Sequence, residues 1–252
     1  MATYEKHYNV NIWWFPQDFC QSRYGEYRNS GTNSCTLISL LLADKMAKEH
    51  LFRATTQKLP PRAVEIFADA MNQGNIVYSR LFKADEENFR KRTPNLNIPE
   101  AITALTGQEN IQFDLQEWFY THLTANPQKD TYKVTVPQRI TKVLNFGIQL
   151  FKQPKNNTTS RNLFAAIIAD SRTTVFVIDF TNNVVSFFDS HQHGHQTGAV
   201  VAQTLLENLP DLIQWFVSMV NQIYHSQPSI YEISFLTTKA DAPNLTNPQN
   251  LS

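Results

Sequence analysis

The pattern of apolar residues changes near Asn157, and this change limits the fold more than any other feature. Before it, apolar side chains recur at helical spacing, and residues 35–51 begin with turns that are apolar nearly all round, which predicts a buried helix. After it, Leu163–Ala169 is an apolar run typical of a buried strand, and Thr173–Phe180 is β-branched and aromatic. A short turn then leads into a further strand, Val184–Asp189. Helices followed by an antiparallel hairpin predict an α+β domain.

The remaining segments extend this arrangement. Further helices are predicted over residues 61–72 (continued by 75–82 beyond Gly74), 98–105, 137–151 and a long stretch over 198–224, interrupted at Pro210. A strand is predicted over residues 230–236, a helix or a strand over 115–123, and an irregular arm or short strand over 1–34. We expect one α+β domain over residues 1–238, followed by a mobile, Asn- and Pro-rich tail over 239–252.

Charge and composition exclude several classes of protein. Lys plus Arg and Asp plus Glu are 22 each, so the formal charge is zero and no basic surface for nucleic acid or anionic membranes is expected. The apolar stretch Leu37–Ala43 is far shorter than the ~20 residues of a membrane helix. Two cysteines make no disulfide framework, and Met1–Val10 is too polar for a secretory signal. We expect a cytoplasmic protein, with the nucleus as an alternative location, and no nucleic-acid or membrane partner.

A candidate nucleophile stands at the start of the most apolar helix. The segment Asn29–Cys35 (NSGTNSC) supplies a glycine for a tight turn and polar residues that can cap a helix. Cys35 then lies on the first turn, where free N–H groups and the helix dipole lower the pKa of a thiol. The same groups can bind an oxyanion, with Asn29 as the preferred additional donor and Gln21 as the second candidate. A lone cysteine is more often an inert core residue, so a second signal is needed.

The second signal lies on the predicted strand that ends the hairpin. Val184–His191 (VVSFFDSH) ends in Asp189 and His191, two residues apart, and side chains two apart on a strand share a face. A carboxylate placed there can accept from one imidazole nitrogen and leave the other free to act as a base. The alternative is a polar strand end without a partner. The early cysteine and the late Asp–His pair are more specific together than either is alone.

The histidines after this strand allow another interpretation. His191, His193 and His195 alternate along an extended stretch (HQHGH), a pattern that can bind a transition metal. We favour a polar loop instead, because the one nearby acidic residue, Asp189, is already paired in the catalytic hypothesis. We therefore expect no metal site and no cofactor. His193 is a candidate for substrate contact.

The order of the two motifs resembles that of papain-fold cysteine proteases, in which a central helix carries the cysteine and a later antiparallel sheet carries the histidine. Within that group, Phe187–His191 (FFDSH) is similar to the hydrophobic-hydrophobic-Asp-x-His motif of the herpesvirus large-tegument-protein deubiquitinases. The early box Asn29–Cys35 also looks like that of the ubiquitin-specific proteases, which we rank second because their catalytic domains are much longer. The resemblance covers two short motifs and their order.

This resemblance implies a papain-like α+β fold with an N-terminal helical part, whose central Cys-bearing helix packs on a late antiparallel sheet. It implies that Cys35 is the nucleophile, His191 the general base and Asp189 its orienter in the hydrolysis of an amide or isopeptide bond. By the same analogy the substrate is ubiquitin or a ubiquitin-like conjugate. Two other hypotheses stay open: a non-catalytic binding or adaptor protein of the same fold, and an acyltransferase that uses the same three residues.

Overall fold

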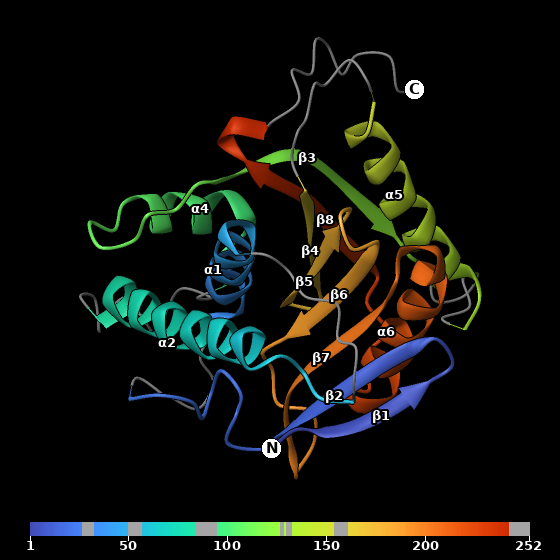
Figure 1. Ribbon diagram of the computed structural model, residues 1–252, viewed down its shortest axis with the longest axis horizontal. Coiled ribbons are helices and arrows are strands. Elements are labelled where there is room, and N and C mark those ends of the chain that lie inside the picture. Colours follow the sequence, from blue (N-terminus) through green and yellow to red (C-terminus); the bar gives the residue numbers. More distant parts are fainter. Residues whose placement is uncertain are drawn as a thin grey trace.

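The computed structural model describes residues 1–26, 33–49, 57–83, 95–126, 129, 133–153 and 161–241. Within them, eight strands form one antiparallel sheet in the order β1-β2-β7-β6-β5-β4-β8-β3 (Figure 1). The strands are β1 (Thr3–His7), β2 (Val10–Pro16), β3 (Leu115–Thr124), β4 (Asn162–Ala169), β5 (Arg172–Asp179), β6 (Val184–Asp189), β7 (Thr197–Leu205) and β8 (Ile230–Thr238). The helices are α1 (Cys35–Lys48), α2 (Pro61–Lys83), α4 (Ile98–Thr106), α5 (Thr135–Phe151) and α6 (Leu209–Ile223), with short 3-10 turns at Leu206–Asn208 and Lys239–Asp241.

Helices cover both faces of the sheet. In Figure 1, α1, α2 and α4 lie on one face and α5 and α6 lie on the other. Two hydrophobic clusters match these layers: Leu37, Phe67 and Leu105 belong to the first, and Leu144 and Phe216 belong to the second. The sheet is therefore the middle layer between two cores, and the Cys-bearing helix α1 packs on it at β5.

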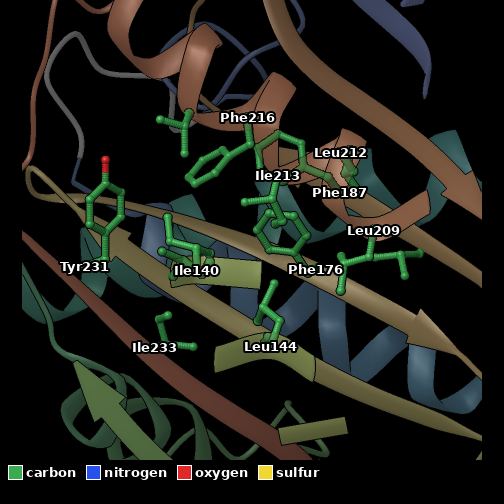
Figure 2. Close-up of a cluster of buried hydrophobic side chains, with 14 of the residues drawn as sticks. Ile140, Leu144, Phe176, Phe187, Leu209, Leu212, Ile213, Phe216, Tyr231 and Ile233 are labelled. Atoms are coloured by element: carbon green, nitrogen blue, oxygen red, sulfur yellow. The ribbon is translucent and has the colours of Figure 1, made fainter. Parts of the chain in front are cut away.

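Three phenylalanines form the centre of the core under α6. Figure 2 shows Phe176 of β5, Phe187 of β6 and Phe216 of α6 side by side. Their ring centroids are 4.9 Å apart for Phe176 and Phe187, 5.3 Å for Phe187 and Phe216, and 5.6 Å for Phe176 and Phe216. These tilted and edge-on contacts are the arrangements that aromatic rings favour. They fix β5 and β6 against α6, and β6 ends in Asp189.

The helix predicted over residues 198–224 is wrong in its first part. Residues Thr197–Leu205 form β7, and the helix α6 begins only at Leu209. On β7, Ala199 and Val201 face the core under α1, whereas Val200 and Ala202 face the core under α6. Because both faces of this central strand are buried, its sequence shows no alternation of apolar and polar residues, and such a run cannot be told from a buried helix by periodicity.

The two segments predicted around Gly74 form one continuous helix, α2. A Cβ atom at Gly74 would lie 2.5 Å from Cγ1 of Ile38 and 3.2 Å from its main-chain nitrogen, both in α1. Glycine therefore does not break the helix here. It lets α2 approach α1 more closely than any other residue would allow.

Other expectations are refined by the structure. The helix near residue 98 is α4, which has a capping box between Asn97 and Glu100 and ends at Gly107. The ambiguous segment at residues 115–123 is the strand β3, and the N-terminal arm contains the hairpin β1–β2. Of the predicted tail, residues 239–241 form a 3-10 turn and 242–252 lie outside the described residues. No helix in the described part of the chain is long and apolar enough to cross a membrane.

Candidate active site

Elements distant in sequence meet at one end of the central strands β5 and β6. Asp189 is the last residue of β6, which pairs antiparallel with β5 in the register Val175↔Phe188, so its end lies beside the turn between β4 and β5. Cys35 is the first residue of α1, and its Sγ lies 4.0 Å from the carbonyl oxygen of Ser171 in that turn. The start of α1 and the end of β6 therefore both lie beside the turn between β4 and β5.

His191 lies two residues beyond the strand, where the chain bends back to the Asp189 carboxylate. Oδ1 of Asp189 accepts a hydrogen bond from the main-chain N–H of His191 at 2.9 Å and lies 2.6 Å from Nδ1 of its ring. Because an ionised carboxylate can only accept, this contact places the proton on Nδ1 and leaves Nε2 to exchange a proton with a partner. The predicted pairing of the two side chains thus arises from a local turn, since β6 ends before His191.

Burial and charge act in opposite directions on these groups. Burial raises the pKa of the Cys35 thiol, but the hydrogen bond and positive charge of His191, and then hydrogen bonds with Thr173, lower it below its usual value. Burial lowers the pKa of His191, but the charge and hydrogen bond of Asp189, and then Cys35, raise it to about 10. Burial raises the pKa of Asp189, but the charges of His191 and His193 hold it well below its usual range. Cys35 and His191 therefore each favour the charged form of the other: His191 lowers the pKa of the Cys35 thiol, and Cys35 contributes to the raised pKa of His191.

His193 does not have the position expected of a substrate contact. Its side chain has no solvent exposure. Its Nδ1 donates to the carbonyl oxygen of Gly198 at 2.8 Å, and its Nε2 lies 3.1 Å from Oδ2 of Asp189 and 2.8 Å from the hydroxyl of Tyr224. That hydroxyl also donates to Oδ2 of Asp189 at 3.1 Å. His193 and Tyr224 therefore contact Oδ2 of Asp189, the oxygen that does not face the His191 ring. Tyr224, which follows α6, carries no sequence signal for this role.

Of the two residues predicted as oxyanion donors, the structure describes only Gln21. Asn29 lies outside the described residues. Gln21 is buried beside the histidine: its main-chain N–H donates to the carbonyl oxygen of Ser190 at 2.8 Å, and its Oε1 accepts from the Ser190 hydroxyl at 2.9 Å. Since the carboxamide oxygen accepts this bond, the amide NH2 is the end of Gln21 that can serve as a donor.

A cavity of about 460 Å³ borders the first turn of α1. Its lining includes Thr36, which follows Cys35, and Ser171, whose carbonyl oxygen faces the thiol. Among the described residues that line it, Asp170 and Glu232 are acidic and none is Lys, Arg or His. Cys35 itself is not part of the lining and is 3% exposed, so the cavity borders the start of α1 rather than the sulfur.

The third histidine of the HQHGH segment, His195, is exposed and apart from this network. In the described residues, no group of three or more His, Cys, Asp or Glu side chains is arranged to hold a metal ion. The second cysteine, Cys20, is buried and its thiol donates to the carbonyl oxygen of Gln17 at 3.3 Å, which is a structural contact.

No family model matches this sequence, and a search of curated proteins finds no match. Among solved structures, the chain is similar to the ubiquitin-specific protease encoded by a murine cytomegalovirus tegument protein, in complex with a ubiquitin-based suicide substrate. The TM-score is 0.51 and the identity 11%, over 90% of this chain and 86% of that chain. The Pseudomonas avirulence protein AvrPphB is also similar, with a TM-score of 0.47 and 9% identity over 89% of this chain and 96% of that chain. At such identity the first likeness establishes the fold alone: this protein has the α+β, papain-like cysteine protease fold that its two motifs predicted.

Proposed function

We propose that this protein is a thiol-dependent hydrolase, similar to the herpesvirus large-tegument-protein deubiquitinases, that cleaves an amide or isopeptide bond. Cys35 is the nucleophile, His191 the general base and Asp189 its orienter. One observation supports this above all: Asp189 holds Nδ1 of His191 at 2.6 Å, and the same imidazole acts by hydrogen bond and charge on the Cys35 thiol. A cysteine nucleophile needs such a base, itself oriented by a third group.

In the first step, the Cys35 thiolate attacks the carbonyl carbon of the scissile bond, and the carbonyl oxygen becomes an oxyanion. The main-chain N–H groups in the first turn of α1, together with the NH2 group of Gln21, are the proposed donors to this oxyanion. The His191 imidazolium then gives its proton to the leaving nitrogen while the C–N bond breaks. The amine departs, and the acyl group stays on the sulfur as a thioester.

In the second step, His191 removes a proton from a water molecule, and the resulting hydroxide attacks the thioester carbon. The C–S bond breaks, the carboxylic acid leaves, and the thiolate and imidazolium are restored. Throughout both steps Asp189 keeps its two hydrogen bonds to His191 and so holds Nε2 toward the sulfur.

The proposed substrate is ubiquitin or a ubiquitin-like conjugate. The similar viral protease was solved with a ubiquitin-based substrate, and the likeness extends over most of both chains. The cavity beside α1 adds a constraint from this chain itself. Asp170 is already paired with Arg172 at 2.9 Å, so Glu232 is the acidic lining residue that favours a positively charged group on the substrate tail. We propose the cytoplasm or the nucleus as the place where the protein meets such conjugates.

Labelling with an electrophilic ubiquitin probe tests this proposal. The full chain is incubated with ubiquitin that carries a thiol-reactive group at its C-terminus, in parallel with Cys35→Ala and with Cys20→Ala as the matched control. We expect a covalent adduct with the wild type and with Cys20→Ala, because the Cys20 thiol contacts Gln17 and Ser22 and not the proposed base His191. We expect none with Cys35→Ala.

Two outcomes would replace the proposal. A folded wild-type protein that reacts with no probe, across ubiquitin and a panel of ubiquitin-like modifiers, contradicts it and favours the non-catalytic binding protein. Labelling that is followed by transfer of the acyl group to an added amine, faster than to water, favours the acyltransferase. Mass spectrometry of the amine acceptor separates the second outcome from hydrolysis.

A further inference from the structure

Buried polar side chains link the segment before Cys35 to the segment before His191. The Ser34 hydroxyl donates to Oδ1 of Asn75 at 2.7 Å, and Nδ2 of Asn75 donates to the carbonyl oxygen of Gln21 at 2.8 Å. Gln21 and Ser190 then exchange two hydrogen bonds, from the Gln21 main-chain N–H at 2.8 Å and from the Ser190 hydroxyl at 2.9 Å. The chain thus runs Ser34–Asn75–Gln21–Ser190.

The two ends of this chain are the direct neighbours of the proposed nucleophile and base. Ser34, Asn75, Gln21 and Ser190 are all buried, with exposed fractions of 0%, 2%, 6% and 3%. Hydrogen bonds away from water are strong, and a buried polar group has no solvent to replace a lost partner. Such a chain therefore defines one position of the two segments relative to each other.

Asn75 is the one member supplied by a helix, and that helix is held close to α1. It follows Gly74, whose missing side chain lets α2 approach Ile38 of α1. Ser34 occupies the N-cap position of α1 but makes no side-chain cap bond to its own helix. Its hydroxyl goes to Asn75 instead, so α2 fixes the start of α1 from outside.

We propose that Asn75 is a positioning residue that sets the place of the Cys35 thiol relative to the His191 imidazole. It acts through Ser34 on one side and through Gln21 and Ser190 on the other, and it touches no reacting atom. The roles of Cys35 and His191 rest on the proposed function, whereas the hydrogen bonds of Asn75 do not. Misplacing a catalytic group by about 1 Å can lower a rate about 100-fold, so a small shift here has a measurable effect.

The test is the pH dependence of Cys35 alkylation by iodoacetamide in the full chain, with the modified peptide identified by mass spectrometry. This readout needs no substrate and follows the thiolate directly. In the described part of the chain, the titratable groups whose pKa is coupled to the Cys35 charge are His191, Tyr78 of α2 and Tyr224, and all three are retained in every variant. Wild type, Asn75→Ala, Ser34→Ala and the double variant are compared.

We expect Asn75→Ala to slow alkylation at neutral pH by about tenfold and to move the midpoint of the profile toward the ~8.5 of an ordinary thiol. Ser34→Ala should move it in the same direction. The double variant should be no slower than Asn75→Ala alone, because both changes remove the same link. Should Asn75→Ala fail to fold, Ser34→Ala, which removes one hydroxyl, carries the test.

Gln203→Ala is the matched control. It also removes a buried hydrogen bond, from Nε2 of Gln203 on β7 to the Ser186 hydroxyl on β6 at 2.9 Å. This bond involves none of the four members of the chain, although Ser186 lies four residues before Ser190. It should lose stability yet keep the wild-type alkylation profile. A folded Asn75→Ala with the wild-type profile, or an equal shift in Gln203→Ala, overturns the inference. An ordinary thiol profile in the wild type would instead contradict the proposed Cys35–His191 pair, and the inference with it.

Discussion

The carboxylate of Asp189 has partners on both of its oxygens. Oδ1 accepts a hydrogen bond from the main-chain N–H of His191 and lies beside Nδ1 of its ring. Oδ2 accepts a hydrogen bond from the Tyr224 hydroxyl and lies beside Nε2 of His193. A buried carboxylate without such partners would be protonated, because burial disfavours the charged form. The charges and hydrogen bonds of His191 and His193 outweigh burial and hold the pKa of Asp189 well below its usual range, and the ionised carboxylate is the state that can orient His191.

Tyr224→Phe tests this support. The change removes the hydroxyl that donates to Asp189 at 3.1 Å but keeps the ring, over which the Arg172 guanidinium lies at 4.4 Å. We expect the free energy of unfolding to fall by about 1–3 kcal/mol, the cost of a lost buried hydrogen bond to a charged group. Urea denaturation measures it, with Tyr120→Phe as the control because Tyr120 is 48% exposed. Equal losses in the two variants would contradict this role.

The raised pKa of His191 makes one part of the stability depend on pH. Asp189 raises it to about 10, above the ~6.5 of an unfolded chain, so folding binds the proton more tightly. This stabilisation is complete below about pH 6.5 and is lost as the pH rises through about 10. The difference in unfolding free energy between wild type and His191→Gln should therefore shrink across that range. A difference that grows with pH, in urea denaturation at several pH values, would show that the sign is wrong.

Local spacing explains which residues the sequence could identify. Asp189 and His191 are two positions apart, and Cys35 marks the start of an apolar helix, so each has a short-range pattern. Tyr224 reaches Asp189 across 35 positions and Asn75 reaches Ser34 across 41, with no motif at either site. Tyr224 and Asn75 reach these positions only because α6 packs on the sheet and α2 packs on α1. The sequence could suggest the proposed nucleophile, base and orienter, but not Tyr224 and Asn75, which support them through hydrogen bonds.

At the level of elements, the sequence that flanks a buried strand decided whether the strand could be predicted. The strands β4, β5 and β6 were predicted because turns bound them closely. Strand β7 was not. Its apolar residues contribute to both cores, as those of the other central strands do, but a helix follows it within a few residues, so the two segments together look like one long helix. Helices were predicted at the positions of α1 and α2, but no sequence pattern indicated that they pack on each other at Gly74.

Gly74→Ala measures how tightly that contact is packed. Alanine favours a helix interior by about 1 kcal/mol over glycine, so propensity alone predicts a gain. A Cβ atom would, however, lie 2.5 Å from Cγ1 of Ile38 and 3.2 Å from its main-chain nitrogen, and the helices must separate. We expect a net loss of about 1–3 kcal/mol in unfolding free energy. Gly107→Ala is the control, because its nearest contact would be at 3.4 Å; a stabilised Gly74→Ala would refute the close contact.

In the whole molecule, one sheet serves two cores. Central strands alternate, so that Val200 and Ala202 of β7 face α6 while Ala199 and Val201 face α1. Neither helical layer can leave without exposing one face of every central strand. We therefore expect the two layers to unfold together.

Phe216→Ala tests this coupling from the face opposite α1. Phe216 is 1% exposed and packs on Phe176 and Phe187 of the sheet (Figure 2), so its loss should cost about 3–5 kcal/mol of unfolding free energy. Hydrogen exchange of the most protected amides reports the same free energy for each layer separately. If the sheet couples the two cores, amides of α1 lose as much protection as those of α6, although α1 touches no altered atom. A loss confined to α6 would mean that the layer carrying Cys35 is stable by itself.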